Sequence, residues 1–153
     1  MTASRIASKL YQGSLPPSAA VLRAQGIHTI VLCAIELQPD DWQFEGAVDV
    51  IRCPFDDNGD RPSARELARI EETALAVAAR VRRSQRALVT CAQGRNRSGL
   101  VGALALIDLY RISGKEAVTW VQRMRENALT NTTFVELLER VPSREHIRER
   151  LAL

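Results

Sequence analysis

The feature that most constrains the fold is a short apolar run that leads into a glycine-containing loop and then into a helix. Residues 87–90 are apolar and predict a very short buried strand, and a helical pattern covers about residues 97–110. The loop between them, residues 91–96, contains Gly94, which can adopt backbone angles that other residues avoid. A buried strand that passes directly into a helix is typical of a sheet covered by helices.

Further strands and helices alternate along the chain, separated by turn residues. The predicted strands span residues 6–11, 28–33 and 47–53. The predicted helices span residues 18–25, 64–83, 113–125, 132–139 and 143–151. Residues 55–62 form a predicted loop, and Ser63 and Ser113 are suited to cap the helices that follow them. In the 64–83 helix, helical spacing predicts a core-facing set made of Leu67, Ile70, Leu75, Ala78 and Val81.

This alternation predicts the fold class. We expect a single α/β domain, residues 1–153, with a central, mostly parallel sheet of four to five strands flanked by helices. The chain is long enough for such a domain to bury a sizeable core. The 91–96 loop would lie between a strand and a helix of this domain.

The composition fits a soluble globular protein. The chain is 46% hydrophobic and 25% charged, and no apolar run approaches the ~18 residues that a membrane span needs. The N-terminus lacks the charged and then apolar pattern of a signal peptide, so we expect a cytoplasmic protein without stable membrane association. The net charge is only +3 and no basic tract is interleaved with aromatic residues, so we expect no nucleic-acid partner.

The cysteine and histidine residues form no recognisable metal site. The three cysteines, Cys33, Cys53 and Cys91, are odd in number and widely spaced, which argues against a disulfide framework. The two histidines, His28 and His146, are far apart and lack metal-ligand spacing with these cysteines. We therefore expect neither a metal nor another cofactor, and the sequence does not indicate an oligomeric state.

The loop combines an anion site with a nucleophile. Backbone N–H groups that open a helix bind anions, helped by the positive end of the helix macrodipole. The Arg97 side chain matches two phosphate oxygens, and the same positive field stabilises Cys91 as a thiolate nucleophile. The Ser98 hydroxyl can point back at the sulfur and stabilise it as a leaving group. The predicted phosphate-binding residues are Ala92, Gln93, Gly94, Arg95, Asn96 and Arg97.

Cys91, Arg97 and Ser98 resemble the His-Cys-x5-Arg-[Ser/Thr] pattern of the cysteine-dependent protein tyrosine phosphatase superfamily. The short single domain resembles the dual-specificity branch, and residues 9–26 resemble the opening segment of that branch. Ala128-Leu-Thr-Asn131 with Phe134 resembles a segment common in bacterial members. The resemblance implies a phosphatase with a phosphocysteine intermediate. The implied substrates are phosphotyrosine and/or phosphoserine/threonine in proteins, or a small phosphate ester.

The resemblance also implies an aspartate on an upstream loop, which acts as the general acid that protonates the leaving oxygen. The family's Pro-x-x-Asp pattern matches Pro54-Phe-Asp-Asp57 and selects Asp57. Asp56 and Asp60 remain alternatives, because the acid must reach the leaving oxygen and spacing alone does not give that geometry.

Variable residues of the loop leave the substrate open. Thr90 stands where the family usually has histidine, and a threonine supplies no positive charge, so we expect a less reactive thiol than is typical. Asn96 before the arginine resembles loops of RNA 5′-triphosphatases, and Arg95 fits an inositol ring with several phosphates, as in tensin-type phosphoinositide phosphatases. These substrates, a non-catalytic phosphate-binding role and rhodanese-like sulfur transfer remain alternatives.

Cys33 and Cys53 are predicted to be structural, since free cysteine packs as a small apolar residue. Cys33 ends a strand that we expect beside the strand of Cys91, and its place resembles that of the backdoor cysteine in the tensin-type group. A Cys33–Cys91 disulfide that protects the nucleophile from over-oxidation is therefore an alternative role.

Overall fold

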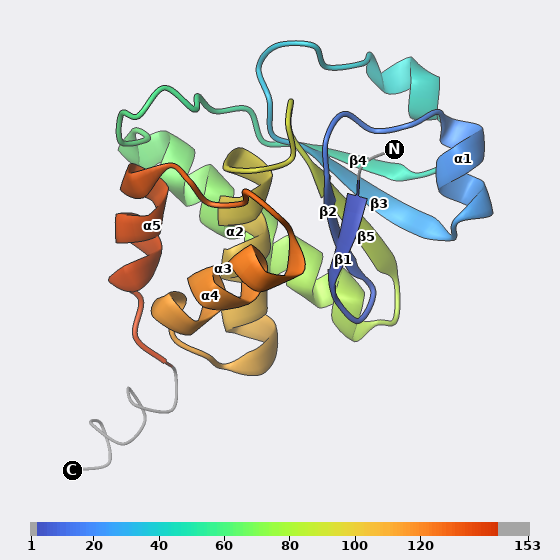
Figure 1. Cartoon of the computed structure of the whole chain (residues 1–153). Coiled ribbons are helices and arrows are strands. Elements are labelled where there is room, and N and C mark those ends of the chain that lie inside the picture. Colours follow the sequence, from blue (N-terminus) through green and yellow to red (C-terminus); the bar gives the residue numbers. More distant parts are fainter. Residues whose placement is uncertain (1–2, 144–153) are drawn as a thin grey trace.

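Five strands form one sheet in the order β1-β2-β5-β3-β4 (Figure 1). The computed structural model describes residues 3–143. The strands are β1 (Ala3–Ala7), β2 (Leu10–Gly13), β3 (Ile27–Leu32), β4 (Asp49–Arg52) and β5 (Arg86–Thr90). β1 pairs antiparallel with β2, whereas the other neighbours pair in parallel, so the predicted mostly parallel sheet is confirmed.

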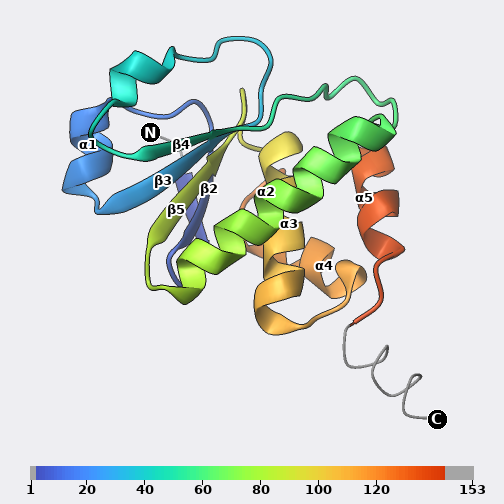
Figure 2. The ribbon, with the colours of Figure 1, turned by 180° about the vertical axis from the view of Figure 1, so that it is seen from behind.

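Helices cover both faces of this sheet (Figures 1 and 2). The helices are α1 (Ala19–Ala24), α2 (Ala64–Arg82), α3 (Arg97–Tyr110), α4 (Gly114–Met124) and α5 (Thr132–Glu139), with a short 3-10 helix, η1 (Asp41–Phe44). α3 lies at the centre of the larger helical layer, where it contacts α2, α4 and α5 as well as β2 and β5. Within residues 3–143 no helix is both long and apolar enough to cross a membrane.

Alternating side chains of the strands fill two separate cores. On one face, Leu88 of β5 packs in a small cluster with Leu22 of α1 and Phe44 of η1. On the other face, Val89 belongs to a larger cluster that includes Leu100 of α3 and residues of α2, α4 and α5. Because successive side chains of β5 point to opposite faces of the sheet, each face packs against helices, as expected for a central parallel strand.

The predicted caps are present. Ser63 accepts a hydrogen bond from the backbone of Glu66, and the Glu66 carboxylate accepts one from the Ser63 backbone in return. Ser113 and Glu116 form the same reciprocal pair at the start of α4. Each pair satisfies backbone donors that a helix start leaves open.

The structure corrects three details of the sequence prediction. The single strand predicted over residues 6–11 is wrong, because the chain reverses at Lys9 (φ 63°) and forms the β1–β2 hairpin. Leu75 is 50% exposed rather than in the core, since five residues from Ile70 is about 140° around a helix. Thr73, Ala74 and Val77 complete the buried face instead. β4 is shorter than the predicted strand at residues 47–53. The predicted 143–151 helix lies outside the described residues except for Ser143.

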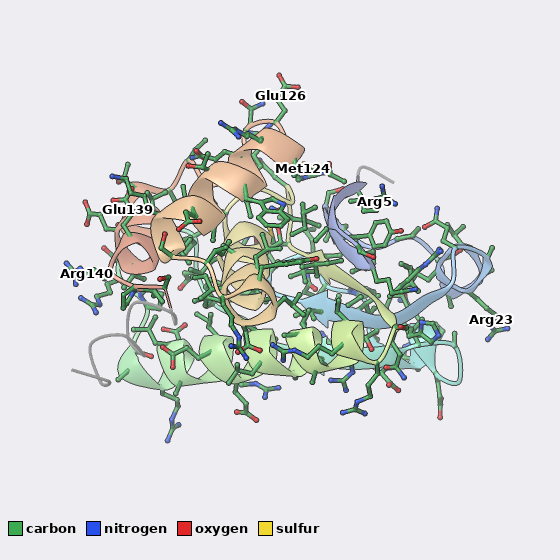
Figure 3. All side chains as sticks on the ribbon, turned by 90° about the horizontal axis from the view of Figure 1, so that it is seen from below. Arg5, Arg23, Met124, Glu126, Glu139 and Arg140 are labelled. Carbon is green, nitrogen blue, oxygen red and sulfur yellow. The ribbon has the colours of Figure 1, made fainter. Side chains whose placement is uncertain are left out.

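Charged side chains project outward from the ends of the elements. Figure 3 shows Arg23 beyond α1 and Glu139 and Arg140 at the end of α5, all pointing away from the ribbon. These three side chains are exposed, whereas Gln12, Arg97 and Ser98, near the loop that follows β5, are among the buried polar side chains.

Candidate active site

The loop that joins β5 to α3 lies where parallel strands end together. Gly13 at the end of β2 and Leu32 at the end of β3 both pair with Thr90 of β5, and Cys91 follows directly. The backbone N–H of Cys91 donates to the Gly13 carbonyl at 3.3 Å. α3 then begins at Arg97, and the side chain of its N-cap residue, Asn96, does not cap it. The N–H groups of this helix start therefore remain free to bind an anion.

Only glycine fits at position 94. Its φ of +68° lies in the left-handed region, and a Cβ there would be 2.3 Å from the carbonyl carbon of Gly13. The loop therefore packs directly against the end of β2. Gly94 itself is buried against that strand and does not line the pocket that the loop encloses.

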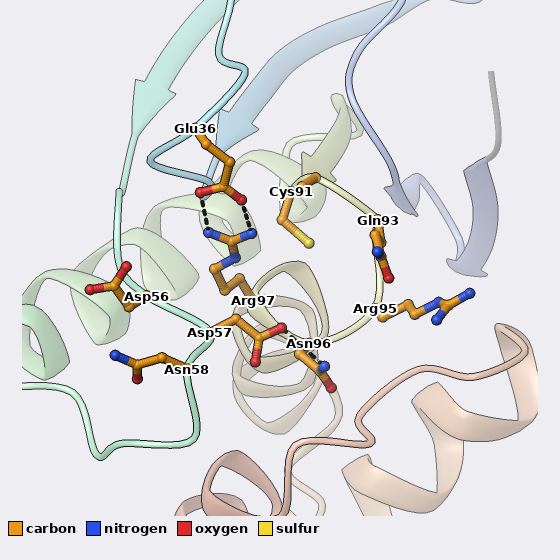
Figure 4. A pocket seen from close by; sticks show the side chains of 10 residues that line it. Glu36, Asp56, Asp57, Asn58, Cys91, Gln93, Arg95, Asn96 and Arg97 are labelled. Atoms are coloured by element: carbon orange, nitrogen blue, oxygen red, sulfur yellow. Dashed lines mark hydrogen bonds and ion pairs between the residues drawn. The ribbon is translucent and has the colours of Figure 1, made fainter.

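This pocket has a volume of about 330 Å³ and opens beside the cysteine (Figure 4). It is lined by Glu36, Asp56, Asp57, Asn58, Cys91, Ala92, Gln93, Arg95, Asn96 and Arg97. The fold thus brings the acidic loop after β4 to the predicted phosphate-binding loop. Asp60, the third candidate acid, does not line the pocket; its backbone N–H donates to the Asn58 side chain at 3.0 Å.

The sulfur of Cys91 lies 3.2 Å from the hydroxyl oxygen of Ser98. Both side chains are buried, with Cys91 only 3% exposed. The Gln12 amide, fully buried on β2, donates to the same hydroxyl oxygen at 3.3 Å. Because that oxygen accepts from Gln12, its own proton is free to be donated to a Cys91 thiolate. Sequence reasoning missed Gln12, which lies 86 residues before Ser98.

The guanidinium of Arg97 is buried and held on one side by a carboxylate (Figure 4). Both of its terminal nitrogens pair with Glu36, Nη1 at 3.1 Å, and Nη1 also donates to the Phe55 carbonyl at 3.3 Å. This hydrogen-bonded pair lowers the pKa of Glu36 to about 2 and raises the pKa of Arg97. The Nε of Arg97 is buried and has no partner among the described residues, so it can donate to a bound phosphate oxygen.

The carboxylate of Asp57 is held by two side-chain amides. Asn131 donates to Oδ1 at 2.7 Å and Asn96 donates to Oδ2 at 3.1 Å. Asp56 lines the pocket but forms no such pair with the loop. Of the three candidate aspartates, Asp57 is thus the one that is hydrogen-bonded to the loop that carries the nucleophile.

Comparisons with known proteins place this arrangement in a family. No family model and no curated protein matches the chain. Among solved structures, human DUSP28 is 26% identical with a TM-score of 0.73, covering 99% of this chain and 95% of its own. Tk-PTP in its active form is also 26% identical with a TM-score of 0.73, covering 90% and 95%. PTPMT1, at 20% identity and a TM-score of 0.78, shares the fold.

This chain belongs to the cysteine-dependent protein tyrosine phosphatase superfamily. Its fold matches the dual-specificity branch, and it is a cysteine-dependent phosphatase. In residues 3–143 of this phosphatase, no group of three or more His, Cys, Asp or Glu side chains is placed to hold a metal ion.

Gln12 and a second side chain that the sequence did not predict, Arg125, hold the backbone carbonyls of the loop that joins β5 to α3. Arg125, just after α4, donates through Nε to the Gly94 carbonyl at 2.6 Å and through Nη2 to the Gln93 carbonyl at 3.4 Å. Gln12 donates to the carbonyls of Gly94 and Arg95 at 3.1 and 3.3 Å. Because C=O and N–H point in opposite directions across a trans peptide, these contacts turn N–H groups inward.

Thr90 ends β5, and Cys33 directly follows β3, which pairs with β5 as the sequence predicted. The Thr90 hydroxyl donates to the Val31 carbonyl of β3 at 2.7 Å, so it supplies its proton to the sheet and not to the sulfur. Cys33 is buried, and its backbone N–H donates to the Thr90 carbonyl at 2.9 Å. Burial raises the pKa of the Cys33 thiol, and all three cysteines are free thiols.

Proposed function

We propose that this phosphatase hydrolyses phosphate monoesters through a phosphocysteine on Cys91 and that its substrates are phosphotyrosine and/or phosphoserine/threonine residues of proteins. One observation carries the assignment of residues. A single pocket contains the Cys91 sulfur, the Arg97 guanidinium and the Asp57 carboxyl, with the Ser98 hydroxyl 3.2 Å from the sulfur. These are the groups that attack, bind, protonate and release in this chemistry.

In the first step the Cys91 thiolate attacks phosphorus while the bond from phosphorus to the leaving oxygen breaks. The backbone N–H groups of residues 92–97 and the free Nε of Arg97 stabilise charge on the other phosphate oxygens. Protonated Asp57 donates its proton to the leaving oxygen, which departs as an alcohol or phenol. The products are phosphocysteine, the Asp57 carboxylate and the dephosphorylated substrate.

In the second step water hydrolyses the phosphocysteine. The Asp57 carboxylate takes a proton from the water, the water oxygen bonds to phosphorus, and the sulfur–phosphorus bond breaks. Ser98 donates its hydroxyl proton as a hydrogen bond to the departing thiolate, and Gln12 supports that hydroxyl from behind. Phosphate leaves and the Cys91 thiolate is restored.

The lining of the pocket supports a protein substrate without a strict choice of residue. A volume of about 330 Å³ is at the lower end for ligand pockets and accommodates a phosphorylated side chain. None of the described lining residues is aromatic, so no ring in that lining clamps a phosphotyrosine side chain. The rest of a protein substrate then lies outside the pocket.

Hydrolysis of p-nitrophenyl phosphate tests the proposal. We expect turnover by the wild-type protein, none above background for Cys91→Ser, and a reduced rate for Asp57→Asn. If the wild type turns over no faster than Cys91→Ser, the chain is a phosphate-binding protein and the proposed catalysis is wrong. Phosphopeptides, phosphoinositides and RNA 5′-triphosphates, compared by kcat/KM, then rank the substrates, and a preference for either of the last two contradicts the protein substrate.

A further inference from the structure

Two asparagines from different parts of the fold hold both oxygens of the Asp57 carboxylate. Asn96 belongs to the phosphate-binding loop and Asn131 precedes α5, 39 and 74 residues from Asp57 in sequence. Figure 4 shows the Asn96 amide directed at Asp57 on the side of the pocket opposite Glu36. The acid loop is also held further along, because the Thr133 hydroxyl donates to the Gly59 carbonyl at 2.7 Å.

The orientation of both amides is defined by their own oxygens. The Asn131 oxygen accepts from the Phe134 backbone N–H at 3.2 Å and so caps α5. The Asn96 oxygen accepts from the Asn131 backbone N–H at 2.8 Å. Since each amide oxygen is committed to a backbone donor, each amide nitrogen must face Asp57. The pair therefore acts as a donor-only clamp on the carboxylate.

We propose that Asn131 is a positioning residue for the general acid, which anchors one oxygen of Asp57 so that the other meets the leaving group. The inference rests on the proposed role of Asp57. Oδ1 is held by the shorter bond, 2.7 Å, to an amide that also caps a helix. Oδ2 is held at 3.1 Å by Asn96, a residue that lines the pocket, and is the oxygen that carries the proton to the substrate.

The clamp presents an amide N–H donor to each oxygen of the Asp57 carboxylate. The other ionisable groups that face the same pocket are Cys91, Glu36, Asp56, Arg95 and Arg97. The first turn of α5 has no acidic residue, and Asn131, the N-cap of that helix, donates to Asp57. The basic limb of the pH–rate profile should therefore respond to the side chain at position 131.

Asn131→Asp is the isosteric test. The new carboxylate keeps an oxygen to cap α5, since aspartate caps helices as well as asparagine does. It places a negative oxygen where the amide donated to Asp57, which favours protonated Asp57. We expect the basic limb of kcat/KM to move up by about one pH unit.

Asn131→Ser removes the anchor and keeps a capping hydroxyl that cannot reach Asp57. Phenolate is a poorer leaving group than p-nitrophenolate and depends more on protonation by the general acid. Loss of the anchor should therefore slow hydrolysis of phenyl phosphate more than that of p-nitrophenyl phosphate. We expect kcat/KM for phenyl phosphate to fall about tenfold further than that for p-nitrophenyl phosphate. In the Asp57→Asn background, Asn131→Ser should add no further difference between the two substrates.

Ser113→Ala serves as the control for loss of a helix cap. Ser113 caps α4 and is not among the residues that line the pocket, so neither the pH profile nor the substrate ratio should change. Suppose that the wild type turns over, that the basic limb of Asn131→Asp does not move, and that Asn131→Ser leaves the ratio of kcat/KM for the two substrates unchanged. This result would overturn the positioning role of Asn131 and leave the proposed function intact. Absence of Cys91-dependent turnover in the wild type would overturn the proposed function and this role together. If Asn131→Asp does not fold, the ratio of kcat/KM for the two substrates in Asn131→Ser decides whether Asn131 positions the acid.

Discussion

The buried guanidinium of Arg97 is paired through both of its terminal nitrogens with the carboxylate of Glu36, a residue 61 positions earlier in the chain. Glu36 is half exposed, so solvent approaches the pair from one side. The contact leaves the Nε of Arg97 without a partner in the described part of the chain. Glu36 thereby fixes the plane of the guanidinium and leaves one edge for a phosphate.

This pair makes stability depend on pH in a defined direction. The pKa of Glu36 falls from 4.5 to about 2 because Arg97 donates hydrogen bonds to it. A carboxyl with a lowered folded-state pKa stabilises the fold above the unfolded pKa and loses that contribution as the pH falls through the folded value. We predict that wild type exceeds Glu36→Gln in free energy of unfolding by a small, constant amount from pH 6 to 8 and that the difference shrinks below about 4.5.

Urea denaturation at a series of pH values, down to the lowest at which both proteins fold, measures this difference. Glu72→Gln is the matched control, because Glu72 pairs at 3.5 Å with Arg69, which is about half exposed, whereas the Arg97 partner of Glu36 is buried. Its effect should be close to zero at every pH. A Glu36→Gln difference that stays constant or grows toward low pH contradicts the prediction.

Gly94→Ala should strongly lower activity and destabilise the fold. The new Cβ would require both a left-handed backbone and space that the Gly13 carbonyl occupies. Gly46 has a similar φ of +73° but no atom within 4 Å of the place that a Cβ would take, so Gly46→Ala should cost only about 1 kcal/mol and leave activity intact. We expect Gly94→Ala to lower kcat/KM by more than about a hundredfold. Equal effects of the two substitutions on stability and turnover would show that the contact with Gly13 is unimportant.

Ser98→Ala should slow the second step more than the first. The Ser98 hydroxyl lies 3.2 Å from the sulfur, and its proposed role is to stabilise the departing thiolate. We predict a rapid burst of p-nitrophenolate followed by a steady-state rate lowered by about a hundredfold. Stopped-flow absorbance measures both phases. A slow steady state without a burst would place the role of Ser98 in the first step.

Mild peroxide should link Cys33 to Cys91. The two residues directly follow the paired positions Leu32 and Thr90 of neighbouring strands. Cys91 lines the pocket whereas Cys33 is fully buried, so peroxide oxidises Cys91 first, and its sulfenic acid then condenses with the Cys33 thiol to a disulfide and water. Peptide mapping should find the cross-link in wild type, and Cys33→Ser should lose more activity irreversibly. Recovery of Cys91 only as sulfinic or sulfonic acid, without a cross-link, would reject the disulfide.

The local features of this protein were predictable from sequence because they depend on neighbouring residues. The strand, loop and helix around Cys91 are contiguous, and the caps at Ser63 and Ser113 act within one helical turn. Hydrophobic spacing also predicted the α/β class. It could not predict the β1–β2 hairpin, where a left-handed Lys9 reverses the chain within a stretch whose alternation predicted a single strand.

The sequence by itself determined the short loop between β5 and α3 and predicted that it binds phosphate, since a strand, a glycine-containing turn and a helix start are contiguous and need no distant partner. Only the tertiary structure decided what surrounds it. Glu36, Gln12, Arg125 and Asn131 reach the site from separate loops and strands, and each contact spans at least 31 residues. Their partners are set by sheet order and helix packing, which act over distances that no local pattern records.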